Sequence, residues 1–409
     1  MNRWGPVALG DLSEIIMGQS PPADDIVDYP TGFPFYQGKA DFGDLYPETT
    51  KYCIKAWKVA EQGDILITVR APVGAVNLNA SRAVIGRGIA SVRPMSKKLH
   101  RDFLFQVLRS PSIASHWQRI QQGSTFDAIN KDSLVSLNIP LPPLPVQRRI
   151  AEILGSVDAV MDSLRLSLDT LTRLEGQIIE HLLSRGINQS EYGTHPSIGS
   201  VPTHWSILPL KSVLLKAQYG LSLPLMASKP ANGIPVLRMN NIRHGILDIS
   251  NVKFLSHIDV TPDYILEDGD VLFNRTNSLD LVGKSACYHA NLIFPLTFAS
   301  YLIRLKPNSN AIIGNFLTLF LNSEKGQQQI RQIITPGVSQ ANISASNLME
   351  ILVPVPPVQE QTKIITFVHA IQKLKASYSA EKDRITSLKT ALLSMLLTKH
   401  PAVEGVTHV

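Results

Sequence analysis

Arginine and asparagine side chains gather in two short segments of the second half of the chain. Residues 238–243 read Arg-Met-Asn-Asn-Ile-Arg and residues 274–278 read Asn-Arg-Thr-Asn-Ser, each just after a strand-like stretch. In the major groove of DNA an arginine pairs bidentately with guanine and an asparagine with adenine, whereas serine and threonine serve bases or phosphates. Both segments therefore carry side chains that could read DNA bases.

The first half offers basic residues at corresponding places, beginning with Gln37-Gly38-Lys39. The residues predicted to contact DNA are Lys39, Arg70, Arg87, Arg93, Arg238, Asn240, Asn241, Arg243, Arg275, Asn277 and Lys284. Arg70 and Arg275 lead this set because each lies beside a strand fed by a Gly-Asp turn. Arginine and asparagine are also common in solvated turns, and that reading stays open for each residue.

Motifs of catalytic sites are not found in the sequence. Residues 281–285 end like a phosphate-binding loop, but Ser278 stands where that loop requires its first glycine. There is no His-Glu-x-x-His, no Asn/Asp-Pro-Pro-aromatic tetrapeptide of amino-methyltransferases and no glycine-rich nucleotide fingerprint after a strand. We therefore expect a chain that is not an enzyme and holds no cofactor or metal of its own.

One stretch of the chain occurs twice and organises the rest. Residues 139–143 (Ile-Pro-Leu-Pro-Pro) are followed by Gln147 and a long helical pattern, and residues 353–357 (Val-Pro-Val-Pro-Pro) are followed by Gln361 and another. The register between the copies is 214 residues throughout. Apolar residues recur every seven places in both copies, which is typical of a helix that packs along a partner helix. The predicted pairing positions are Ile150, Val157, Leu164, Leu171 and Ile178, then Ile364, Ile371, Tyr378, Ile385 and Leu392.

The repeat predicts two α+β domains and two stem helices, each helix about 55–60 Å long. The expected segments are a first globular domain over 1–146, a central stem helix over 147–186, a linker over 187–203, a second globular domain over 204–357, a distal stem helix over 358–400 and a tail over 401–409. A linker that reverses direction would let the helices lie antiparallel, with an internal pseudo-two-fold repeat. Such a protein would hold two readers a fixed span apart.

Composition narrows the class of protein without deciding it. Of 409 residues 44% are hydrophobic, and 39 Lys/Arg against 33 Asp/Glu give a net charge of +6, which mildly favours a polyanionic partner. No apolar run is long enough for a membrane span, and no signal peptide is seen near Met1. The two cysteines, Cys53 and Cys287, lie in different halves, so we expect no disulfide framework and a cytoplasmic location.

Taken in order, these motifs resemble the specificity subunits of type I restriction–modification systems (the HsdS family), over nearly the whole chain. The resemblance rests on the two proline-rich approaches to Gln147 and Gln361, the long helix after each, and residues 270–277 (Asp-Val-Leu-Phe-Asn-Arg-Thr-Asn) followed by Val-Gly-Lys at 282–284. The first copy departs from the family pattern at Val146, where an acidic residue is usual; Glu360 keeps that residue in the second copy.

The resemblance implies that each globular domain is a target-recognition domain for one half of a split sequence in double-stranded DNA. The paired helices would set the spacer and dock two modification subunits, which carry S-adenosylmethionine and methylate adenine. Separate restriction subunits would carry the motor and nuclease, with ATP and Mg. Two alternatives stay open: a coiled-coil scaffold with protein-binding end domains, and a stand-alone enzyme.

Overall fold

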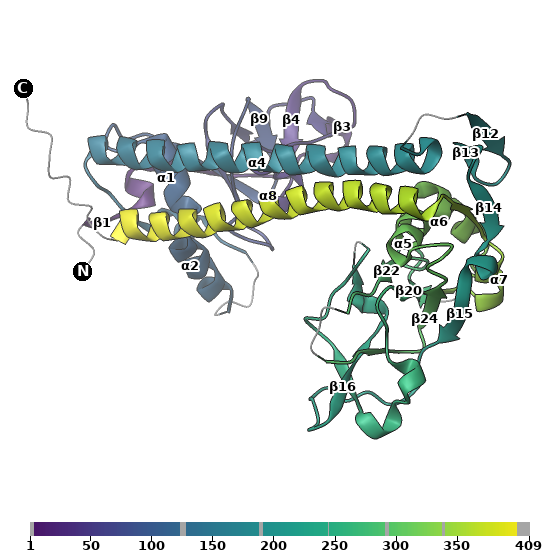
Figure 1. Ribbon diagram of the computed structural model, residues 1–409. Coiled ribbons are helices and arrows are strands. Elements are labelled where there is room, and N and C mark those ends of the chain that lie inside the picture. The colour runs from purple at the N-terminus through teal and green to yellow at the C-terminus, as the bar shows by residue number, and fades with distance from the viewer. Residues whose placement is uncertain are drawn as a thin grey trace, which may run out of the picture. The chain divides into compact units, whose positions relative to one another are not determined.

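The structure is a computed structural model. It describes residues 4–122, 128–187, 191–243, 245–290, 294–337 and 340–398. The predicted tail over 401–409 lies outside these ranges. The chain divides into two compact units, one of Met1–Leu166 with Ser379–Val409 and one of Ser167–Tyr378. Figure 1 labels the helices and strands of both units.

Each unit contains a four-stranded antiparallel sheet, and the order of the strands is the same in both. The first sheet runs β2 (Ser13–Met17), β10 (Ile89–Pro94), β7 (Ile65–Thr68), β8 (Val76–Leu78). The second runs β15 (Leu214–Tyr219), β24 (Leu302–Pro307), β20 (Val271–Asn274), β22 (Ser285–Cys287). The internal repeat predicted from the sequence is therefore a repeat of structure.

The strands β7 and β20 are buried on both faces, which explains why they read as unbroken apolar runs. On β7, Ile65 and Ile67 pack with the helix side of the unit, whereas Leu66 packs with Tyr36 and Ile85 on the other face. Strand β20 divides its side chains between two clusters in the same way.

A second sheet of short strands covers the other face of each main sheet. In the first unit it has the order β3 (Ile26–Val27), β5 (Tyr52–Cys53), β4 (Phe33–Tyr36), β9 (Ala83–Ile85), β6 (Val59–Ala60). In the second unit it has the order β19 (Lys253–Ser256), β16 (Gly233–Leu237), β23 (Thr297–Phe298). Strands β4 and β9 pair in parallel, as do β16 and β23.

The remaining elements also correspond between the units. In the first they are β1 (Pro6–Ala8) paired with β11 (Asn138–Pro140), and helices α1 (Arg101–Leu108), α2 (Pro111–Gln122) and α3 (Lys131–Val135). In the second they are β14 (Ser206–Pro209) paired with β26 (Leu352–Val355), and α5 (Gly314–Asn322), α6 (Glu324–Gln332) and α7 (Ala345–Met349). The second unit also has the short pairs β17 (Ile242–Arg243) with β18 (Ile246–Leu247) and β21 (Thr276–Asn277) with β25 (Ala341–Asn342). The predicted linker contains a hairpin of β12 (Tyr192–His195) and β13 (Gly199–Pro202).

Two long helices, α4 (Leu144–Arg185) and α8 (Val358–Thr398), each run through both units (Figure 1). In the first unit Lys389 of α8 is ion-paired with Asp158 of α4, and Leu396 near the end of α8 lies in one apolar cluster with Ile150 near the start of α4. The helices therefore run antiparallel in this unit.

The second unit repeats this arrangement with other residues. Glu175 of α4 is ion-paired with Lys375 of α8 and accepts a hydrogen bond from Gln372 Nε2 (3.1 Å). The Glu360 carboxylate at the start of α8 accepts from the backbone N–H of Ile187, just past the end of α4 (3.1 Å). Acids of α4 meet a base of α8 in both units, in keeping with the opposite charge of the two helices.

The heptad positions face the partner helix only in part. Ile150 and Ile364 are 4% and 0% exposed, and the other eight predicted pairing residues are half-buried. Four places further on, Leu154 and Val368 are also buried. Most apolar residues three places further on are exposed instead; Ile153 is half-buried, and the exposed ones are Val160, Leu174, Phe367, Leu374, Leu388 and Met395. The flank that packs is therefore the one at i+4.

Candidate nucleic-acid interface

In the second unit, loops that follow four different strands come together at one edge of the sheets. The N–H of Leu221 donates to the carbonyl of Phe298 (2.9 Å), and the N–H of Ala299 donates to the carbonyl of Leu237 (2.8 Å). Asn274 at the end of β20 donates from Nδ2 to the carbonyl of Met239 (3.1 Å). The two Arg/Asn segments predicted from the sequence therefore lie side by side, although 36 residues separate their first members, Arg238 and Asn274.

Arg275 is held in one orientation at this edge. Its guanidinium lies over the Tyr219 ring, 5.0 Å from the centroid, and its Nε donates to the Ile343 carbonyl (3.4 Å). Tyr219 is itself anchored, because its hydroxyl accepts from the Ala345 N–H (3.0 Å). A stacked arginine loses less rotamer entropy when it pairs with a base, so this geometry suits base recognition.

Other predicted residues of this edge hold the loop rather than face solvent. Asn241 is 3% exposed; its Oδ1 accepts from the Arg238 N–H (2.9 Å), and its Nδ2 donates to the carbonyls of Asp248 and Asn251 (2.7 and 3.1 Å). One guanidinium nitrogen of Arg238 donates to the same Asn251 carbonyl (3.2 Å). These bonds shape the 238–243 loop, and Asn240 is an exposed side chain on it.

The last three predicted residues of this unit differ in their exposure and in their bonding partners. Arg243 is exposed and lies 3.6 Å from the Asp248 carboxylate. Asn277 is buried on β21 and accepts from the Ser278 N–H (2.8 Å). Lys284 donates from Nζ to Gln327 Oε1 on α6 (3.2 Å). Of the three, Arg243 presents the most accessible charge.

The first unit builds the same edge with other side chains. Gly86 and Gly88 flank the exposed Arg87, and a Cβ on Gly88 would lie 2.3 Å from the Gln37 carbonyl. These glycines let the loop after β9 lie against the loop after β4, where Lys39 is also exposed. Arg70 is exposed after β7 and bridges to Ala128.

Backbone hydrogen bonds define which residues correspond between the two edges. Val69 donates to the carbonyl of Gly88 and accepts from Ile129, and Arg275 donates to the carbonyl of Tyr301 and accepts from Ile343. Arg275 therefore corresponds to Val69, and Arg70 corresponds to Thr276, which is also the match given by the Gly-Asp turns at Gly63 and Gly269. The aromatic partner Tyr219 is not singled out by the sequence; the available signal is its place at the strand end, directly before Gly220.

Arg93 lies at the opposite end of the first sheet. Its guanidinium bonds both oxygens of the buried Asp64 (2.8 Å each) and reaches Glu14 (3.2 Å). The hydrogen bonds that Arg93 donates to Asp64 raise the pKa of Arg93. This arginine closes the Gly-Asp turn within the sheet, and its contact with DNA stays a prediction.

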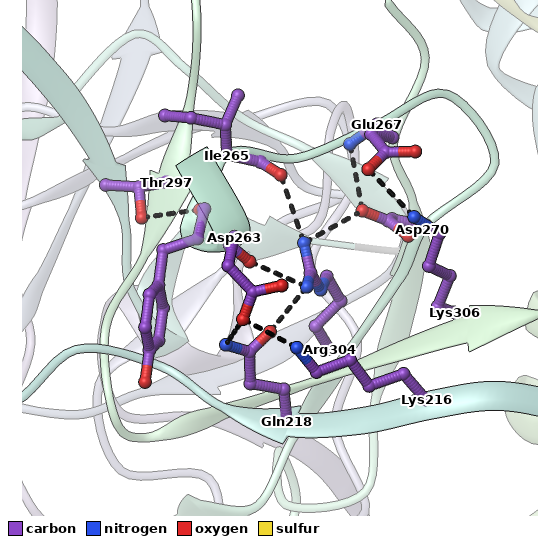
Figure 2. Close-up of polar contacts among 10 residues, drawn as sticks. Lys216, Gln218, Asp263, Ile265, Glu267, Asp270, Thr297, Arg304 and Lys306 are labelled. Carbon is purple, nitrogen blue, oxygen red and sulfur yellow. Dashed lines mark hydrogen bonds and ion pairs between the residues drawn. The ribbon is translucent and has the colours of Figure 1, made fainter. Parts of the chain in front are cut away.

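The same end of the second sheet holds a closed ionic network (Figure 2). Arg304, 2% exposed, donates to the carbonyls of Ile265 and Asp263 (3.0 and 2.8 Å) and to Gln218 Oε1, and lies 3.6 Å from Asp270. Burial raises the pKa of Asp270. Lys306 pairs with Glu267 and Lys216 with Asp263, and each pairing lowers the pKa of its carboxyl partner. The positive charges here are neutralised internally, which leaves the opposite edge as the candidate interface.

The residues that the structure describes were also compared with the requirements of a metal site and of a membrane span. Among these residues no three His, Cys, Asp or Glu side chains come together in a way that could hold a metal ion. No helix described in the structure is both long and apolar enough to cross a membrane.

Fold and site together define a duplicated α+β module carried on a pair of long helices. The family model described as the type I restriction modification DNA specificity domain matches residues 1–173 and again residues 202–387. This chain belongs to that family.

Three individual similarities agree with the assignment. The MjaX specificity subunit of Methanocaldococcus jannaschii is 39% identical over 185 residues, which are 44% of this chain and 43% of that protein. The MjaVIII specificity subunit of the same organism is 22% identical over 97% of this chain and 92% of its own length. The crystal structure of the type I S subunit from M. genitalium shares the fold, with a TM-score of 0.57 and 17% identity over 98% of this chain and 97% of that one. The chain thus spans less than half of the first relative and nearly all of the other two.

The family confirms two expectations from the sequence. The α+β class with two recognition domains and a long helix pair is confirmed by the duplicated match and the shared fold. The expectation of a recognition subunit rather than an enzyme is confirmed by the specificity-subunit relatives.

Proposed function

We propose that this chain is the DNA-specificity subunit of a type I restriction–modification complex, and that each recognition domain reads one half of a bipartite site. One observation carries the proposal: the same loop edge is built twice with the same backbone hydrogen bonds but with different side chains. Phosphate-binding and base-reading residues can vary on such a frame without loss of fold. Two domains with different edges then read two different half-sites.

In the second domain we assign base reading to Arg275, with Asn240 beside it, and phosphate contact to Arg243. In the first domain the exposed Arg70, Arg87 and Lys39 form the corresponding set. The buried Asn241 and Asn277 position the loops. Asn241 and Asn277 are set apart by burial, since a side chain whose polar atoms are already bonded inside the protein has little left to offer a base. Arg275 is set apart from Arg243 by its stacking on Tyr219.

The two stem helices set the spacer between the half-sites and dock two modification subunits. Their exposed apolar residues at heptad spacing are suited to a partner helix: Phe367 is 52% exposed, Leu374 46%, Leu388 53% and Met395 47%. S-adenosylmethionine belongs to the modification subunits, and ATP and Mg to separate restriction subunits. The complex acts on double-stranded DNA in the cytoplasm.

An exchange of domains tests the proposal. Residues 204–357 are replaced by the corresponding domain of another type I specificity subunit, and the assembled complex selects sites from a random DNA library. One half-site should change while the other half-site stays the same. A change in both halves, or no sequence selection by the natural chain, would contradict the proposal and favour a coiled-coil scaffold with protein-binding ends.

A further inference from the structure

A buried glutamine joins the first stem helix to the body of its unit. Gln147 is 0% exposed in the first turn of α4. Its Nε2 donates to the carbonyls of Lys98 and Pro142 (2.8 and 2.7 Å), and its Oε1 accepts from the N–H of His100 (2.8 Å). Lys98 and His100 lie in the loop that leads into α1, so one side chain connects the helix, its proline-rich approach and the domain.

The second unit repeats this connection bond for bond. Gln361, also 0% exposed, donates from Nε2 to the carbonyls of Ala311 and Pro356 (2.8 Å each). Its Oε1 accepts from the N–H of Ile313 (2.8 Å), directly before α5. The same three hydrogen bonds at both stems indicate a role that goes beyond filling space.

Hydrogen bonds and apolar packing contribute differently at this junction. Ile150 and Ile364 pack the first turns of the helices against the domain cores. Apolar packing resists separation but is non-directional, so it tolerates a small rotation. Three hydrogen bonds to one planar amide have strict directions, so they do not tolerate such a rotation. Each glutamine therefore adds a directional restraint on the angle between its domain and its stem.

We propose that Gln147 and Gln361 are positioning residues for spacer length, each holding the angle at which its recognition domain meets the stem. The inference rests on the proposed bipartite function. The rotation that matters can be judged from the dimensions of a domain, whose reading edge lies about 30 Å from the junction. A rotation of about 6 degrees at the junction moves that edge by about 3.4 Å, the rise of one base pair. A loosened junction would let the same two domains bind half-sites whose spacer is one base pair shorter or longer.

The second junction has an additional restraint that the first does not have. Glu360 is 9% exposed, and besides the Ile187 N–H it accepts from Trp205 Nε1 (3.1 Å) and lies 2.9 Å from His204 Nε2. Val146 occupies the corresponding place in the first copy and cannot make these bonds. The first junction has a polar contact of its own, because Asp158 of α4 accepts from Gln106 Nε2 of α1 (2.7 Å), so the loss of either glutamine should loosen its junction to a similar degree.

The experiment compares spacer selectivity of assembled complexes on DNA with fixed half-sites and spacers one base pair shorter or longer. The full chain carries Gln147→Met or Gln361→Met, which keep the length of the side chain and remove its hydrogen bonds. Gln147→Glu keeps the acceptor for His100 but replaces the donor to the carbonyls of Lys98 and Pro142 by an acceptor, so it should loosen the junction at least as much. Gln359→Met is the matched control, since Gln359 is an exposed glutamine in the same turn of α8.

The natural chain and the Gln359→Met control should lose about ten-fold in affinity for each wrong spacer. Gln147→Met, Gln361→Met and Gln147→Glu should each lose less than about three-fold for a wrong spacer, with the half-sites unchanged. Selectivity is a ratio, so a lower folded fraction does not alter it. If both methionine variants keep the full ten-fold preference, the inference is overturned. If the natural chain shows no half-site selection, the proposed function fails instead.

Discussion

Arg275 provides the sharpest test of how the second domain reads DNA. The perturbation is Arg275→Ala, with Arg243→Ala as a matched control on a neighbouring loop. Both arginines lie at the same edge, but Arg275 is stacked on Tyr219 at 5.0 Å, whereas Arg243 is exposed beside Asp248. Their loss should therefore have different consequences for specific and non-specific binding.

The expected magnitudes follow from the contacts. A bidentate arginine–guanine pair is worth about 1–3 kcal/mol, so Arg275→Ala should weaken cognate binding by about 5- to 150-fold at 1.4 kcal/mol per factor of ten. Tyr219→Leu removes the stacking partner, worth about 0.5–1 kcal/mol, and should cost about two- to five-fold. Tyr219→Phe keeps the ring and should cost less.

The assay is equilibrium binding of the complex, assembled with its modification subunits, to cognate and random duplexes at one salt concentration. Arg275→Ala should lower cognate affinity alone, and Arg243→Ala should lower both affinities and reduce the salt dependence. Equal losses on both DNAs for Arg275→Ala would refute its assignment as a base-reading residue. Unchanged thermal unfolding of the variant separates this result from misfolding.

Three further outcomes are expected. Burial acts to raise the pKa of Glu360, but the hydrogen bonds of its carboxylate outweigh burial and lower the pKa from 4.5. These bonds therefore stabilise the fold above about pH 4.5, and the stabilisation is lost as the pH falls through the lowered pKa. In the Glu360→Gln variant the thermal unfolding temperature should change less with pH below pH 4.5. Asp158→Asn should destabilise the fold by about 3 kcal/mol in urea unfolding, because it leaves the buried Lys389 amine without its carboxylate. The double variant Asp158→Asn with Lys389→Met should recover most of the lost stability, and additive losses would contradict the pairing. Phe367→Asp and Leu388→Asp should leave the fold intact, since both side chains are exposed, yet weaken assembly with modification subunits by about ten-fold in titrations followed by light scattering.

The duplication and the stems were predictable because they depend on period and order alone. The 214-residue register predicts that Gln147 and Gln361 correspond, and the structure gives them the same three bonds. A seven-residue repeat also predicts a long helix, but it does not tell which flank packs. The sequence favours the flank at i+3, where Phe367 lies; the structure buries the flank at i+4, where Val368 lies.

The candidate site was predictable only in part, because burial and side-chain partners depend on contacts between distant segments. The Gly-Asp turns, 206 residues apart from Gly63 to Gly269, match Arg70 with Thr276 and Val69 with Arg275, and the hydrogen bonds give the same match. The Arg304 network joins residues up to 86 positions apart, from Gln218 to Arg304, which no local pattern could reveal. Burial of Asn241 likewise depends on the loop that carries Asp248 and Asn251, whose path cannot be predicted from local sequence.

Genome-wide mapping of methylated adenines tests the central claim most directly, in cells that express this chain with its modification subunits. If two domains on paired helices read DNA as proposed, the methylated sites will share one motif of two fixed blocks separated by a spacer of constant length. A single unbroken motif, or two blocks separated by spacers of many lengths, would contradict the account.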